Sequence, residues 1–192
     1  MSCIRPLAAA LAATALALAG CDREAPADKT AASPPAAGQT PVATETVMDL
    51  ISRDPDHTTL VSALHVAGMA DTLDSAGPFT LFAPTNASLE KIPAERREFL
   101  TSEAGLPELR RILSYHVVPG RLDAASLVQR TQAGGGTLAL TTLQGGVLTA
   151  RVGANGSVEL TDAAGGTLRV VEADAVGSNG VVHAVDALAA PG

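Results

Sequence analysis

GPFTLFAPTN, residues 77–86, contains the signals for a turn, a strand and the start of a helix in immediate succession. The Gly-Pro pair marks the turn. The apolar run Phe79–Ala83 then predicts a strand, which ends at the next proline. Thr85 or Asn86 can accept hydrogen bonds from free backbone amides, so either side chain is suited to cap a following helix. The stretch therefore predicts a strand that leads directly into a helix.

Apolar residues on both sides of this stretch recur with a helical period. Asp54-Pro55 stops a first short helix, and Thr58 or Thr59 can cap a second one, which Gly68 weakens from within. Pro107 is acceptable in the first turn of the last helix of this part. The predicted helices cover residues 45–53, 58–73, 85–92, 93–100 and 106–118.

Beyond Gly134 the apolar residues alternate with a period of two, which is typical of β-strands. Asn155-Gly156 tolerates the positive φ values of a tight hairpin turn, so it predicts a hairpin over residues 147–161. Helices followed by strands predict an α+β domain and not a doubly wound sheet. The predicted strands cover residues 137–140, 147–152, 157–161, 167–173 and 181–187.

Three blocks of the sequence resemble, in order and spacing, the signature blocks of the fasciclin (FAS1) domain family. They are GPFTLFAPTN (77–86), YHVVPG (115–120) and SNGVVHAVD (178–186). The resemblance covers about Glu45–Pro191 and implies a β-rich wedge with helices packed around it. It also implies a set of structural signature residues: Phe79, Phe82, Pro84, Thr85, Asn86, Asn179, Gly180 and His183.

The resemblance implies adhesion to other proteins, cell surfaces or matrix polymers, without catalysis. In animal matrix members of the family the Tyr-His block is implicated in receptor contact. Carried over to this sequence, the candidate interaction residues are Tyr115, His116, Val117 and Val118. The residues themselves favour another interpretation, because polar tips on apolar bodies at a helix-to-strand junction are typical of core residues. A buried pair of this kind would shape a binding surface without touching the partner.

The first residues have the composition of an export signal. Arg5 precedes an uncharged run, Leu7–Ala19, which is too short to span a membrane. The run ends in Leu18-Ala19-Gly20-Cys21, which resembles the bacterial lipobox with Cys21 as the lipidated residue. We therefore expect a signal peptide over residues 1–20, a lipidated cysteine with an Ala/Pro-rich tether over 21–44, and the fasciclin domain over 45–192. Asp22 resembles the signal that keeps enterobacterial lipoproteins in the inner membrane, so the resemblance favours the inner membrane facing the periplasm, with the outer membrane as the alternative.

The composition excludes several classes of partner. A net charge of −7 and an aromatic content of 2% argue against binding to nucleic acid. The sequence contains no P-loop, HExxH, GxSxG or CxxC motif, so no cofactor and no metal site is predicted. Of the two cysteines, Cys3 would leave with the signal peptide, so no disulfide is expected.

Three functions remain in competition. The first is a non-catalytic, lipid-anchored adhesion module that binds an unidentified envelope or cell-surface protein or polymer. The second is a periplasmic structural or regulatory partner of an inner-membrane protein, which Asp22 favours. The third is a small-ligand binder or enzyme, which would require His116 to meet Asp123, or His183 to meet Asp186, in an open pocket.

Overall fold

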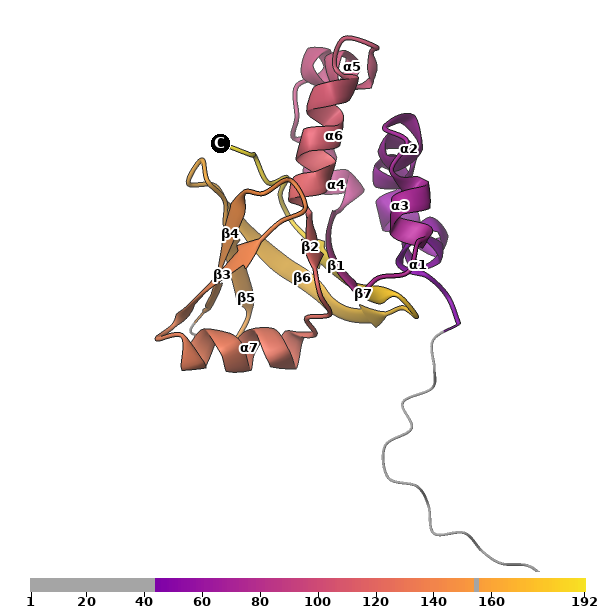
Figure 1. Ribbon diagram of the computed structural model, residues 1–192. Helices are drawn as coiled ribbons and strands as arrows, with labels where there is room; N and C mark the ends of the chain where they lie inside the picture. The colour runs from indigo at the N-terminus through magenta and orange to yellow at the C-terminus, as the bar shows by residue number, and fades with distance from the viewer. Residues whose placement is uncertain (1–43, 154–155) are drawn as a thin grey trace, which may run out of the picture. The chain divides into compact units, whose positions relative to one another are not determined.

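The computed structural model describes residues 44–153 and 156–192 (Figure 1). The expected signal peptide (1–20), Cys21 and all of the tether except Thr44 lie outside these residues. Within the described residues, no helix is both long and apolar enough to cross a membrane. The elements, in chain order, are α1 (Val47–Arg53), the 3₁₀ helix η1 (Pro55–His57), α2 (Thr58–Val66), α3 (Ala70–Asp74), β1 (Phe79–Pro84), α4 (Asn86–Glu90), α5 (Ala94–Thr101), α6 (Leu106–Tyr115), β2 (Val117–Pro119), α7 (Ala124–Ala133), β3 (Thr137–Thr141), β4 (Val147–Val152), β5 (Val158–Thr161), β6 (Thr167–Val176) and β7 (Gly180–Val185).

The strands form one mixed sheet in the order β2-β1-β7-β6-β5-β4-β3. β1 and β7 run parallel, and the other neighbouring pairs are antiparallel. The two edge strands approach each other, because the N–H of Leu143, in the turn after β3, donates to the carbonyl of Val117 in β2 at 2.8 Å. The sheet therefore curls almost into a barrel (Figure 1). This arrangement confirms the predicted α+β class, and β4 and β5 form the predicted hairpin.

Two hydrophobic cores lie on opposite faces of β1, because neighbouring side chains of a strand point to opposite faces. Leu81 and Ala83 pack into the first core, against the helices α1, α2 and α6. Phe82 packs into the second core, which fills the curled sheet and includes Leu127 of α7. The central strand is thus buried on both faces, as its nearly continuous apolar run requires.

The helical part differs from the prediction in three ways. The expected helix over 58–73 is divided into α2 and α3, because Gly68 takes a left-handed φ of +66° between them. The helix α7 was not predicted; its N-cap is Asp123, whose carboxylate accepts a hydrogen bond from the N–H of Ser126 at 2.7 Å. The predicted helix over 106–118 ends at Tyr115, and the residues that follow it form β2.

Candidate functional site

Asn86, in the first signature block, holds the start of α2. Its Oδ1 accepts from the N–H of Thr59 at 3.0 Å, and its Nδ2 donates to the carbonyl of Pro55 and the hydroxyl of Thr58. The predicted cap by Thr58 or Thr59 is therefore wrong: α2 has no side-chain cap of its own, and the amide comes from a distant residue. The cap of α4 is Thr85, which accepts from the N–H of Ser88 at 3.3 Å.

Asn179, in the third block, holds the two ends of the α1–α3 segment. Its Oδ1 accepts from the N–H of Val47, the first residue of α1, at 2.8 Å. Its Nδ2 donates to the carbonyls of Leu73 at 2.6 Å and Ser75 at 2.8 Å, at the end of α3. The two signature asparagines thus attach the N-terminal helices to the central strands.

Gly180 and His183, both in β7, serve packing. A Cβ at Gly180 would lie 2.3 Å from the carbonyl oxygen of Phe79, so the parallel pairing of β1 and β7 requires glycine here. This close approach, and not a positive φ in the preceding turn, is the reason for glycine at this position. The fully buried imidazole of His183 stacks on Phe82, with ring centroids 5.6 Å apart. Its Nε2 donates to the carbonyl of Leu122 at 2.7 Å.

The first four residues of the Tyr-His block lie at the junction of α6 and β2 and are buried. Tyr115, His116 and Val117 have no exposed surface, and Val118 retains 3%. The Nδ1 atom of His116 lies 2.8 Å from the carbonyl oxygen of Ile112, one helical turn earlier. Burial lowers the pKa of His116 to about 4, although this hydrogen bond and the nearby Asp162 act in the opposite direction. In this structure the four residues are core residues, so their side chains are not exposed for direct contact with a partner.

Tyr115 supports residues 142–147, which comprise the turn between β3 and β4 and the first residue of β4. Its hydroxyl donates to the carbonyl of Val147 at 2.7 Å and accepts from the N–H of Ala163 at 3.0 Å. Gly146 lies flat against the ring, where a Cβ would come within 2.5 Å of the Tyr115 Cε2 atom. Burial raises the pKa of the Tyr115 hydroxyl, so it remains a hydrogen-bond donor throughout the ordinary pH range.

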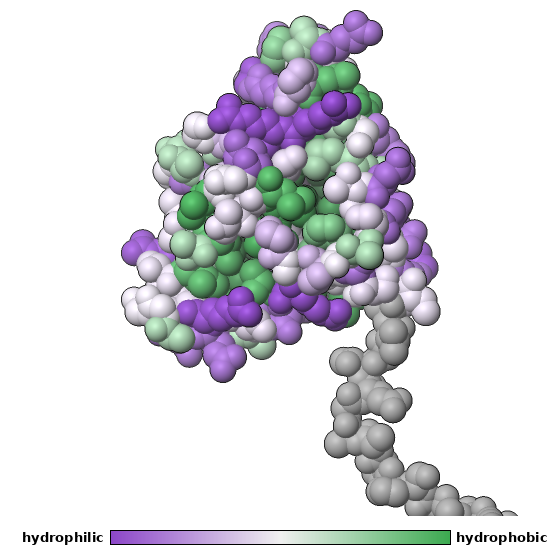
Figure 2. Space-filling model, viewed as in Figure 1, coloured by the Kyte–Doolittle hydropathy of each residue, from purple (hydrophilic) through white to green (hydrophobic). Residues whose placement is uncertain are grey.

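The supported turn exposes two large apolar side chains. Leu143 is 42% exposed and Val147 is 45% exposed. The backbone beside them is fixed, because Leu143 N–H bonds to Val117 and Gln144 N–H bonds to Ser114. Figure 2 shows the face of the molecule on which β2, β3 and β4 lie. Hydrophobic surface gathers over these strands, between two hydrophilic bands. The Tyr-His block therefore shapes an apolar surface patch, which we define as Leu143 and Val147.

This patch was not predicted from the sequence. Leu143 and Val147 flank Gly145-Gly146, and a leucine within a glycine-containing turn was the one available signal. Its exposure depends on the closure of the sheet, which brings Val117 to Leu143 across a long stretch of chain. That closure has no local signature in the sequence.

The two histidine–carboxylate pairs considered for catalysis do not form as expected. Asp162 is the carboxylate near His116, whereas Asp174 and Asp123 are near His183. Asp186 accepts a hydrogen bond from the N–H of Arg169 instead. Burial lowers the pKa of His183, so both buried imidazoles are neutral near pH 7. Among the described residues, no group of three or more His, Cys, Asp or Glu side chains is arranged to hold a metal ion.

Comparison with known proteins identifies the class to which this fold and this site belong. The sequence profile of the family described as "Fasciclin domain" matches residues 55–191. The chain therefore belongs to the fasciclin family, in agreement with its three signature blocks.

Individual relatives support this assignment. "Protein sll1483" of Synechocystis sp. is 33% identical over 146 residues, which cover 76% of this chain and 73% of that protein. "Transforming growth factor-beta-induced protein ig-h3" of Sus scrofa is 34% identical over 146 residues, 76% of this chain but only 19% of that protein. A FAS1 domain pair from the insect cell adhesion molecule Fasciclin I has the same fold. The match has a TM-score of 0.68 at 21% identity and covers 77% of this chain and 51% of that one.

Proposed function

We propose that this protein is a non-catalytic interaction module. Its fasciclin domain binds an envelope or cell-surface protein or polymer through the apolar patch formed by Leu143 and Val147. One observation carries the proposal: two exposed apolar side chains stand on a turn that the buried Tyr115 and Val117 hold in place. A rigid apolar surface loses little conformational entropy when a partner covers it. The cell adhesion molecule Fasciclin I, which has the same fold, supports an adhesive role.

The proposed mechanism is the burial of apolar surface without turnover. Each square ångström of apolar surface removed from water contributes about 25 cal/mol, so a patch of this size gives a weak individual contact. Weak contacts of this kind bury less than about 1,200 Å² in total. Anchoring by lipid at Cys21 would place many copies on one membrane, where avidity strengthens the binding. We place the protein in the bacterial envelope, at the inner membrane or alternatively at the outer membrane.

The binding surface is tested by immobilising the full chain and counting retained cells of the source bacterium. Leu143→Asp and Val147→Asp should each reduce retention at least several-fold, because a charge placed in the patch would have to be desolvated. The matched control is Val171→Asp, since Val171 in β6 is 59% exposed and lies outside the patch. Equal retention by all three variants would refute this surface, and no retention by the unaltered protein would refute adhesion.

The anchor is tested separately. Cys21→Ser removes the proposed lipidation site and should move the protein from the membrane fraction to the soluble fraction. Separation of inner from outer membranes for the unaltered protein then locates it. An inner-membrane location, which Asp22 favours, would support the alternative function, a structural or regulatory partner of a neighbouring membrane protein, because retention at that membrane would keep the domain from reaching another cell.

A further inference from the structure

A second apolar feature lies among the helices. Helices α2, α4, α5 and α6 leave between them a slot of about 150 Å³. Its floor consists of residues of the first core, among them Leu60, Leu109 and Leu113, and its mouth opens beside Val66, which is 46% exposed. No lining residue belongs to the 142–147 turn, so the slot is distinct from the patch of the proposed function.

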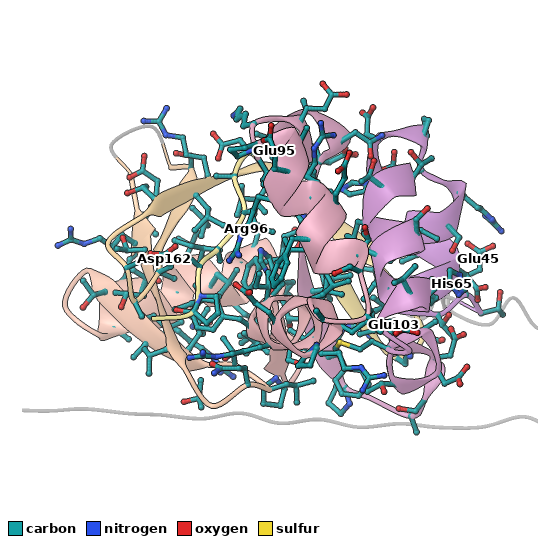
Figure 3. All side chains as sticks on the ribbon, turned by 90° about the horizontal axis from the view of Figure 1, so that it is seen from above. Glu45, His65, Glu95, Arg96, Glu103 and Asp162 are labelled. Carbon is teal, nitrogen blue, oxygen red and sulfur yellow. The ribbon has the colours of Figure 1, made fainter. Side chains whose placement is uncertain are left out.

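A second cavity lies beside the slot. This wider cavity, of about 580 Å³, shares four lining residues with the slot: Ile92, Leu100, Ile112 and Leu188. This cavity runs between α5–α6 and the C-terminal segment, residues 188–191. Figure 3 shows that Arg96 and Asp162 lie close to this segment. A slot of 150 Å³ has room for a group of about the size of benzene, and the adjoining cavity offers space along α5 and α6 for a chain that extends beyond the slot.

One cationic side chain lines the slot without a partner among the described residues. Four arginines belong to α5 and α6, and three of them are engaged: Arg96 by Glu108, Arg110 by the carbonyl of Ala67, and Arg111 by the carbonyl of Gly192. Arg97 is exposed, lines the slot, and makes no ion pair or side-chain hydrogen bond within the described part of the chain. A guanidinium carried by a side chain that lines an apolar slot is complementary to a carboxylate attached to an alkyl chain.

We propose that the slot binds a single-chain anionic amphiphile of the fatty-acid class, with the alkyl chain between α2 and α6 and the carboxylate at Arg97. Burial of the chain supplies affinity, at about fourfold in Kd for each methylene removed from water. The ion pair supplies orientation and selectivity for the acid over the alcohol. This binding does not depend on the adhesive function.

The proposal is tested by calorimetric titration of the full chain at pH 7 with octanoate, decanoate and octan-1-ol, all as monomers. Decanoate should bind about 15-fold more tightly than octanoate, because two more methylenes are buried. Arg97→Gln should weaken octanoate binding about tenfold and leave octan-1-ol unchanged, whereas Arg130→Gln, an exposed arginine on α7, should change neither. Ala63→Phe should fill the slot and abolish binding of all three probes.

Val66→Asp provides a second variant whose folding is not in doubt, because Val66 is exposed at the mouth. It should weaken both acids more than the alcohol by charge repulsion. The proposal is overturned if decanoate gives no saturable binding, if Val66→Asp and Ala63→Phe leave binding unchanged, or if Arg97→Gln weakens acid and alcohol equally. Binding to phosphatidylglycerol vesicles without binding to monomeric decanoate would also overturn it, since the feature would then be a membrane-binding surface.

Discussion

His116 accepts a hydrogen bond at Nε2 from the backbone N–H of Ala189, with 3.0 Å between the two nitrogens. Its other ring nitrogen lies 2.8 Å from the carbonyl oxygen of Ile112 and must donate to it. One accepting and one donating nitrogen define the neutral tautomer with the proton on Nδ1. The ring thereby joins the end of α6 to the C-terminal segment, and a second proton would eliminate the bond to Ala189.

This relationship predicts that the domain loses stability in mild acid. The pKa of His116 is lowered from 6.5 to about 4, so between these values the unfolded chain binds a proton that the folded chain does not. The free energy of unfolding therefore falls as the pH falls from 6.5 to 4, by about 3 kcal/mol for this residue. Well above pH 6.5 the ring is neutral in both states and makes no contribution to the slope. The measurement is urea unfolding at several pH values.

Two variants isolate the contribution of His116. His116→Gln removes the titrating ring, so its free energy of unfolding should depend less on pH by up to one proton between pH 6.5 and 5. His65→Gln, at an exposed position on α2, should follow the unaltered protein. The buried His183, whose pKa is lowered too, adds to the slope in both proteins. Identical slopes for His116→Gln and the unaltered protein would contradict the prediction.

Removal of the Tyr115 hydroxyl should loosen the turn beneath the proposed binding patch. Tyr115→Phe leaves the carbonyl of Val147 and the N–H of Ala163 without their partner, which costs about 1–3 kcal/mol. Faster hydrogen exchange at residues 142–147 should accompany this loss, whereas α1 should be unaffected. A loss of stability spread evenly over the domain would argue against a local supporting role.

The sequence predicts the elements that have local signals. Asn155-Gly156 between alternating segments was sufficient for the β4–β5 hairpin, and the Phe79–Ala83 run was sufficient for β1. The helix α7 was missed although Asp123 caps it, because an isolated aspartate is as typical of a turn as of a helix start.

The long-range contacts had no signal in a single sequence. Asn86 and Asn179 are both typical turn or cap residues, and their neighbours indicate only local roles. Their actual partners, Thr59 and Val47, are distant along the chain and are brought near only by the assembled sheet. The exposure of Leu143 has the same origin, since it depends on the approach of β2 to the 142–147 turn.

Asn179 should contribute more stability than Asn86. Asn179→Ala leaves the buried N–H of Val47 and the buried carbonyl of Leu73 unpaired, at about 2–3 kcal/mol. Asn86→Ala removes bonds at a more exposed helix start, where water can replace them, and should cost about 1 kcal/mol. Thermal unfolding ranks the two variants, and hydrogen exchange should increase in α1 for the first and in α2 for the second. The reverse ranking would show that the α1–α3 segment is held by its apolar packing alone.

Gly180→Ala should disrupt the pairing of the two central strands. The new Cβ would lie 2.3 Å from the carbonyl oxygen of Phe79 and 2.7 Å from Val47 Cγ2. Because Phe79 and Gly180 form the first pair of the parallel ladder, the backbone cannot move away without breaking hydrogen bonds. We expect a loss of more than about 2 kcal/mol in urea unfolding. Gly135→Ala is the control: its Cβ would meet no atom within 4 Å, and only its φ of +74° would be strained, at about 1–2 kcal/mol. A smaller loss for Gly180→Ala than for Gly135→Ala would mean that the β1–β7 ladder can shift to accept a side chain.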